Sequence, residues 1–220
     1  HGSMLLYSIL YLTGYPDISL EDIKNFRQLN SKTAGHPEYG HLPGIETTTG
    51  PLGQGLGNAV GFAVAEEFVA ARWGSHLCDH FTYVIAGDGC LMEGISQEVI
   101  SLAGRLKLKK LIVIWDDNGI TIDGPLDLSC NTDQISRFQS SGWSTFSCDA
   151  HNPIEIDQAI SNAKIDPRPS LIAAKSIIGY GSKGKQGTSG VHGAALGNSE
   201  VNRLRNNFNW NYNEFVIPSN

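Results

Sequence analysis

Two apolar, β-branched segments of this chain each lead directly into an acidic turn. Residues 81–86 precede Gly87-Asp88-Gly89, and residues 110–115 precede Asp116-Asp117-Asn118. Runs of this length and composition predict buried strands. A helical pattern between them predicts a parallel pair joined by a helical crossover. Both turns are therefore expected at the carboxyl ends of neighbouring strands, where open parallel sheets bind their ligands.

These turns supply oxygen ligands of a kind that suits a hard cation. The Asp88 carboxylate, the Asn118 amide oxygen and the Ile120 backbone carbonyl would form such a set. Mg²⁺ and Ca²⁺ prefer oxygen ligands, and phosphate oxygens and water can fill the remaining positions. The alternative is ordinary turn chemistry, which Asp-Gly and Asn-Gly dipeptides often represent. Each turn alone favours that alternative, whereas the pair favours a metal-diphosphate site.

The rest of the chain continues the alternation of helices and strands. Further strands are expected at 142–147 and 170–175, and long loops at 30–53, 120–135 and 179–197, the last one glycine-rich and flexible over an active-site mouth. Helices are expected at 4–12, from Ser19 onward, and at 58–73, 94–106, 132–141 and 152–166. This order predicts an α/β fold: a doubly wound, mostly parallel sheet with helices on both faces.

Composition narrows the class of partner. The formal net charge of −6 and the absence of a basic stripe argue against nucleic acid or an anionic membrane surface as the main partner. The four cysteines show no metal-binding or redox spacing, which is typical of a reducing cytoplasm. No segment is apolar and long enough to predict a membrane span. We expect one cytoplasmic α/β domain.

Several motifs together resemble transketolases along nearly the whole chain. Gly87-Asp88-Gly89 and Asn118 have the form and spacing of the thiamine diphosphate signature. Further matching segments are Gly35-His36-Pro37-Glu38, Glu46 to Gly55 (ETTTGPLGQG), residues 116–124 (DDNGITIDG) and His192-Gly193-Ala194. The first two narrow the resemblance to transketolase or its close relative dihydroxyacetone synthase. The resemblance implies a thiamine diphosphate-binding fold, of which this chain is the diphosphate-binding domain. It also implies transfer of a two-carbon ketol unit between sugar phosphates in the pentose phosphate pathway, by a homodimer with its cofactor at the subunit interface.

The resemblance sets expectations about the extent of the domain. Residues 1–205 would form the diphosphate-binding domain without its N-terminal leader, and residues 206–220 would lead toward a pyrimidine-binding domain. The chain is then expected to be truncated and inactive alone, because the family's activating glutamate and its aromatic bed for the pyrimidine come from that second domain. His1-Gly-Ser-Met also resembles a cloning scar, although the helix after it matches the family.

The resemblance also assigns the cofactor site. Asp88, Asn118 and Ile120 would bind Mg²⁺, with Ca²⁺ or Mn²⁺ as substitutes. Gly89 would let the backbone approach the diphosphate. Gly50, Pro51 and Leu52 would line the cleft near the cofactor rings. Independently of the resemblance, a glycine just before a helix N-terminus lets an anion approach the backbone closely.

Three histidines and one glutamate are implied in catalysis. His1 and His36 would hydrogen-bond the cofactor or the hydroxyls of the sugar, and His192 the diphosphate and the substrate carbonyl. Glu93, expected in the first turn of a helix, would communicate with the partner subunit's glutamate. One departure weakens the assignment of His192: Ala195 stands where the family usually has proline.

Other functions remain open at this stage. Dihydroxyacetone synthase or another thiamine diphosphate enzyme would share these motifs. A Rossmann-type nucleotide binder is disfavoured, because no Gly-x-Gly-x-x-Gly follows the first strand. A non-catalytic dimerisation domain would have the same fold without metal-dependent cofactor binding.

Overall fold

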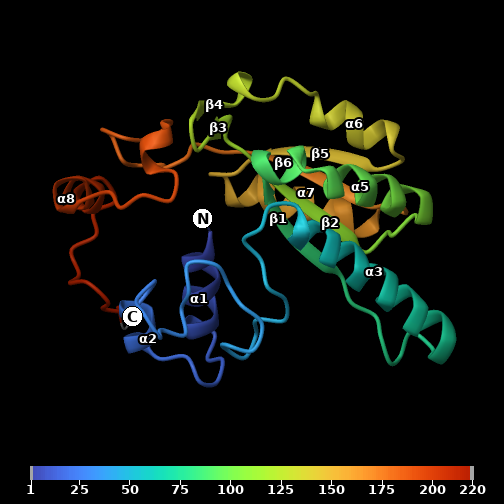
Figure 1. Cartoon of the computed structure of the whole chain (residues 1–220), viewed down its shortest axis with the longest axis horizontal. Coiled ribbons are helices and arrows are strands. Elements are labelled where there is room, and N and C mark those ends of the chain that lie inside the picture. Colours follow the sequence, from blue (N-terminus) through green and yellow to red (C-terminus); the bar gives the residue numbers. More distant parts are fainter. Residues whose placement is uncertain (1, 219–220) are drawn as a thin grey trace. The chain divides into compact units, whose positions relative to one another are not determined.

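The computed structural model describes residues 2–218 and divides them into two units (Figure 1). The first unit contains the described residues up to Gly50, together with Gly181–Lys185 and those from Val191 onward. The second contains Pro51–Tyr180 and Gln186–Gly190. Each unit is described by itself.

A four-stranded parallel sheet forms the centre of the second unit (Figure 1). The strands are β1 (Thr82–Gly87), β2 (Leu111–Asp117), β5 (Ser144–Asp149) and β6 (Ser170–Lys175), in the order β1-β2-β6-β5. All three neighbouring pairs are parallel. A separate antiparallel pair joins β3 (Ile120–Thr121) to β4 (Gly124–Pro125). The mostly parallel sheet expected from the sequence is confirmed.

Helices cover both faces of this sheet because side chains alternate along each strand. On one face, Leu111 and Val113 pack in a cluster with residues of α3 (Gln54–Trp73), α5 (Gly94–Leu106) and α6 (Gln134–Ser140). On the other face, Ile112 packs with residues of α7 (Pro153–Ile165). The doubly wound arrangement is therefore confirmed.

The strand expected at residues 81–86 is present as β1, but the expectation that it is buried was wrong for part of its length. Tyr83 and Ile85 have exposed fractions of 47% and 65%, whereas Ala86 on the opposite face is buried. The reason is strand order, since β1 lies at an edge of the four-stranded sheet. In the described part of the chain, only one face of β1 is covered over these positions.

Several other element boundaries differ from those expected from the sequence. β2 extends through Asp116 and Asp117, because its pairing with β6 continues to the register pair Asp117↔Lys175. The segment expected to be irregular after residue 120 contains β3, β4 and the short helix η1 (Leu126–Leu128). Asp88 begins a short helix, α4 (Asp88–Met92), rather than an open turn.

The first unit is helical and has its own core. Tyr7 and Leu10 of α1 (Ser3–Leu12) pack with Ile23 of α2 (Leu20–Lys24). The expected cap is confirmed, because Ser19 and Asp22 form a reciprocal capping box at the start of α2. This helix is only five residues long.

The glycine-rich segment is attached to α8 (Asn198–Asn207) through one buried carboxylate. Glu200 Oε1 accepts hydrogen bonds from the Ser182 hydroxyl at 2.8 Å and from the Gly184 amide at 3.0 Å. The Gly184 amide is the main cause of a lowered pKa for Glu200. This part of the expected flexible loop is therefore held by an ionised side chain. The remaining short helix, η2, spans Ser189–Val191.

One helix of the second unit approaches a turn too closely for any side chain. A Cβ atom at Gly104 would lie 1.7 Å from the Ser141 carbonyl oxygen. We expect Gly104→Ala to lower the free energy of unfolding by about 3 kcal/mol, the upper end of the cost of overpacking. Gly61→Ala is the matched control, since Gly61 is exposed in α3 and its Cβ would meet nothing. That control should stabilise the chain by up to about 1 kcal/mol through helix propensity. Urea unfolding of both variants checks this, and equal effects would contradict the packing argument.

A buried glutamate depends on one lysine. Lys110 Nζ lies 2.6 Å from Glu66 Oε1 and 2.6 Å from Asp79 Oδ1. Only 2% of Glu66 is exposed. We expect Lys110→Met to cost about 3–5 kcal/mol of unfolding free energy, because it leaves a buried carboxylate without its cation. Asp79→Asn removes only the exposed partner and should cost about 1 kcal/mol or less. Denaturant titration of the two variants measures the difference, and similar losses would show that burial of Glu66 is not the cause.

Candidate functional site

Parallel pairing of β1 and β2 places two acidic segments at one edge of the sheet. The last register pair of these strands is Gly87↔Asp116. Asp88 therefore follows β1 at the level where β2 ends in Asp117, and Asn118 comes next. The juxtaposition expected from the sequence is confirmed for these two strand ends.

Asp88 is a buried carboxylate with one unpartnered oxygen. It is 5% exposed, and its Oδ1 accepts a hydrogen bond from Trp115 Nε1 at 2.9 Å. Its Oδ2 is also buried and has no hydrogen-bond partner among the described residues. Burial raises the pKa of Asp88, and the carboxylates of Asp117 and Asp116 add to the rise, although the Trp115 indole and the Gly119 amide oppose it. Such an oxygen fits a cation, whose charge would remove the penalty of burying the ionised form.

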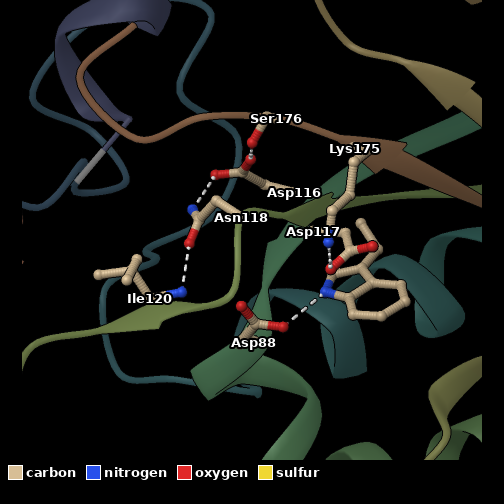
Figure 2. Close-up of polar contacts among 8 residues, drawn as sticks. Asp88, Asp116, Asp117, Asn118, Ile120, Lys175 and Ser176 are labelled. Carbon is tan, nitrogen blue, oxygen red and sulfur yellow. Dashed lines mark hydrogen bonds and ion pairs between the residues drawn. The ribbon is translucent and has the colours of Figure 1, made fainter. Parts of the chain in front are cut away.

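Asn118 and Ile120 lie on the side of Asp88 toward which its free oxygen points (Figure 2). Asn118 Oδ1 accepts a hydrogen bond from the Ile120 amide at 2.9 Å, and the antiparallel pairing of β3 with β4 holds Ile120 in place. Residues 2–218 contain no group of three His, Cys, Asp or Glu side chains able to hold a metal ion. A site here would therefore use one carboxylate, one amide and a backbone carbonyl. That composition leaves room for ligands supplied by a phosphate group and suits Mg²⁺.

Gly89 and Leu52 are brought together. A Cβ atom at Gly89 would lie 3.1 Å from Leu52 Cδ1, so the absence of a side chain permits this approach. Pro51 and Leu52 are both exposed just before α3. Three of the residues expected to bind cofactor, Leu52, Asp88 and Gly89, thus lie around the first turn of α4.

The placement of Glu93 differs from the expectation. Glu93 is the N-cap of α5, with extended backbone angles, and does not belong to the first turn of the helix. It makes no side-chain cap, and its side chain is exposed. The reason is that α4 ends at Met92 and the chain changes direction before α5. Gly53 packs on this junction, since its Cβ would lie 2.8 Å from Glu93 Cβ.

His36, His192 and Gly50 belong to the first unit. The His36 ring packs on Gly50, whose Cβ would lie 2.4 Å from His36 Cγ, and Gly50 has a φ of +129°. The next residues are joined by a hydrogen bond from the Thr49 amide to the Pro37 carbonyl at 3.1 Å. His192 is half-buried, and this burial lowers its pKa and favours the neutral imidazole. His1 lies outside the described residues.

The site contains residues that sequence reasoning missed. Ser176 donates a hydrogen bond to Asp116 Oδ1, and Lys175 pairs with Asp117 Oδ1 at 3.3 Å (Figure 2). Both contacts result from the pairing of β6 with β2, two strands that are far apart in the sequence. No sequence signal identifies that neighbour. Trp115 precedes the acidic turn and could have been considered as a donor to Asp88.

None of the helices in the described part of the chain combines the length and hydropathy needed to span a membrane.

Comparisons with known proteins show which family the chain belongs to. The family model described as transketolase, thiamine diphosphate binding domain, matches residues 1–220. A transketolase of Cereibacter sphaeroides is 57% identical over 219 residues, which cover 100% of this chain and 33% of that protein. The chain thus spans about a third of the length of the curated relatives that it matches.

Solved structures give the same result. Transketolase from Campylobacter jejuni is 46% identical with a TM-score of 0.95, covering 99% of this chain and 34% of that one. Transketolase from Pichia stipitis, solved in complex with sedoheptulose-7-phosphate, is 47% identical with a TM-score of 0.92, covering 97% and 32%. With matches over its whole length, this chain belongs to the transketolase family, of which it represents the thiamine diphosphate-binding domain.

Proposed function

We propose that this chain is the diphosphate-binding part of a transketolase that transfers a two-carbon ketol unit from a ketose phosphate to an aldose phosphate. The observation that carries the proposal is the buried, unpartnered Asp88 oxygen at the β1 end, beside Asn118 at the end of β2. The family assignment supplies the reaction class and favours it over nucleotide binding. We further propose a homodimer with the cofactor at the subunit interface, acting in the pentose phosphate pathway of the cytoplasm.

The metal site would neutralise the cofactor's diphosphate. Asp88 Oδ2, Asn118 Oδ1 and the Ile120 carbonyl would hold Mg²⁺, or Ca²⁺ or Mn²⁺ in its place. Phosphate oxygens and water would complete the coordination. Gly89 keeps the backbone at the start of α4 accessible.

Other residues would hold the ring systems and the sugar. Gly50, Pro51 and Leu52 would line the cofactor cleft. His1, His36 and His192 would bind hydroxyl, carbonyl or phosphate groups. The lowered pKa of His192 keeps its imidazole neutral near pH 7, so one ring nitrogen can accept a proton from a sugar hydroxyl. Thiamine diphosphate, when bound, supplies the nucleophilic carbon of ketol transfer. Glu93 would act at the subunit boundary.

Asp88→Asn should remove cofactor binding while the protein still folds. We expect it to abolish Mg²⁺-dependent thiamine diphosphate binding, because the only carboxylate of the proposed ligand set is lost. Calorimetric titration of the complete transketolase polypeptide that includes these residues measures this. Asp157→Asn, at an exposed position of α7, is the matched control and should bind as the parent does. Tight metal-dependent binding by Asp88→Asn would contradict the proposed site.

The same substitution should raise the unfolding free energy of the metal-free chain at pH 7. The folded-state pKa of Asp88 lies above the unfolded value of about 3.9, so the wild type loses stability as pH rises through that interval. Asparagine removes this loss, and its advantage should vanish below about pH 4. Urea unfolding of the 220-residue chain at several pH values checks the sign. An advantage independent of pH would exclude ionisation as its cause.

The 220-residue chain should be inactive in ketol transfer by itself. The proposed cofactor activation needs groups from a second domain, and the described residues account for about a third of the length of the relatives. An assay with saturating cofactor, Mg²⁺ and sugar phosphates tests this. A complete relative serves as the positive control, and comparable turnover would refute the expectation.

A further inference from the structure

A chain of hydrogen bonds leads from β6 to the proposed metal ligand Asn118 (Figure 2). The Ser176 hydroxyl donates to Asp116 Oδ1. Asp116 Oδ2 accepts from Asn118 Nδ2 at 3.0 Å. Asn118 Oδ1 accepts from the Ile120 amide at 2.9 Å. Every member is partly buried, and all four belong to the second unit.

This chain determines which end of the Asn118 amide faces the site. An amide side chain can rotate by half a turn and exchange its oxygen with its NH₂ group. A carboxylate only accepts hydrogen bonds, so Asp116 must face the NH₂ group. A backbone amide only donates, so Ile120 must face the oxygen. The two contacts agree on one orientation. The rotated form would place two donors together at Ile120 and two acceptors together at Asp116, and would direct an NH₂ group at a cation.

Asp116 is itself fixed from the neighbouring strand. Asp116 pairs in register with Ala174 of β6, and Ser176 follows two residues later. The Ser176 amide continues the ladder by donating to the Asp117 carbonyl at 3.2 Å. Backbone pairing thus places the Ser176 hydroxyl beside Asp116.

The adjacent Asp117 provides a contrast within the same turn. Its carboxylate pairs with Lys175 at 3.3 Å, whereas the Asn118 side-chain NH₂ group donates its hydrogen bond to Asp116. Asp116 and Asp117 therefore contribute similar charge to this sheet edge but only one of them orients Asn118.

We propose that Asp116 and Ser176 are positioning residues that hold the Asn118 oxygen toward the cation. The inference rests on the proposed function, because it takes Asn118 as a metal ligand. Residues that hydrogen-bond a metal ligand typically contribute about 10- to 100-fold in metal affinity. We expect effects of that order for Asp116 and Ser176.

The experiment measures Mn²⁺ binding to the complete polypeptide in the presence of thiamine diphosphate, from the electron paramagnetic resonance signal of the free ion. Asp116→Asn should weaken Mn²⁺ binding by about 10- to 100-fold, since asparagine can face either end of Asn118. Ser176→Ala should weaken it by about tenfold, and Ser176→Thr, which keeps the hydroxyl, should bind as the wild type does. Asp117→Asn removes the same charge without touching Asn118, and should change affinity by about threefold or less because of screening.

A swapped pair separates the hydrogen bond between residues 116 and 118 from net charge. In the double variant Asp116→Asn/Asn118→Asp, the new amide can donate to the new carboxylate and still accept from Ser176. We expect it to restore Mn²⁺ affinity to within about threefold of the wild type or better, whereas Asn118→Asp alone should bind more weakly than the pair. Thermal unfolding of each metal-free variant should stay close to that of the wild type.

Several outcomes would overturn the inference. Equal weakening by Asp116→Asn and Asp117→Asn would assign the effect to charge. Failure of the swapped pair, or equal binding by Asn118→Asp alone, would show that the hydrogen bond between residues 116 and 118 does not contribute to affinity. If Asp116→Asn does not fold, Ser176→Ala and Ser176→Thr provide the test. Equal Mn²⁺ affinity of these two variants would overturn the inference. Wild-type Mn²⁺ binding by Asp88→Asn and Asn118→Ala would instead refute the proposed function.

Discussion

The register between β1 and β2 is the constraint on which the candidate site depends. Backbone pairing ends at Gly87↔Asp116, so the next residues of two strands separated by a helix emerge at one edge of the sheet. A shift of one residue would turn every side chain of a strand to the opposite face. The core prevents this, because Leu111 and Val113 pack on one face and Ile112 on the other. The packing that stabilises the sheet therefore also positions Asp88 and Asn118.

Two buried carboxylates of the second unit differ in whether a cationic side chain pairs with them. Glu66 has the ammonium group of Lys110 at 2.6 Å, and hydrogen bonds to Asp79 and Glu66 raise the pKa of that lysine. Each carboxylate has one buried oxygen without a hydrogen-bond partner, Glu66 Oε2 and Asp88 Oδ2, but Asp88 has no ion pair in the described part of the chain. Glu66 is thus neutralised within the fold and serves structure, whereas Asp88 retains an electrostatic cost. Sites that bind ions commonly retain such a cost until the ligand arrives.

Local patterns were sufficient for much of the fold and for part of the site. Strand composition and the acidic turns predicted a parallel pair, and its two ends meet as expected. The exposure of Tyr83 and Ile85, by contrast, depends on β1 being an edge strand, and an apolar run does not encode strand order. Ser176 was missed for the same reason, since β6 becomes the neighbour of β2 only through the topology. Glu93 was expected in the first turn of the helix and is instead its N-cap, because α4 ends at Met92 and α5 begins only at Gly94. The division at residue 205 stays a prediction, as do the roles assigned to all the predicted site residues: His1, His36, Gly50, Pro51, Leu52, Asp88, Gly89, Glu93, Asn118, Ile120 and His192.

The hydrogen bond between the Trp115 indole and Asp88 has an optical consequence. Indole emission responds to charge and to hydrogen bonding at its ring nitrogen, and this ring is 7% exposed. A cation arriving at Asp88 would alter the field on that ring, whereas Trp143 donates to the Ile100 carbonyl deep in the core and would be unaffected. The fold thus carries its own fluorophore at the carboxyl edge of the sheet, beside the proposed metal site, together with an internal reference that reports only on the integrity of the core.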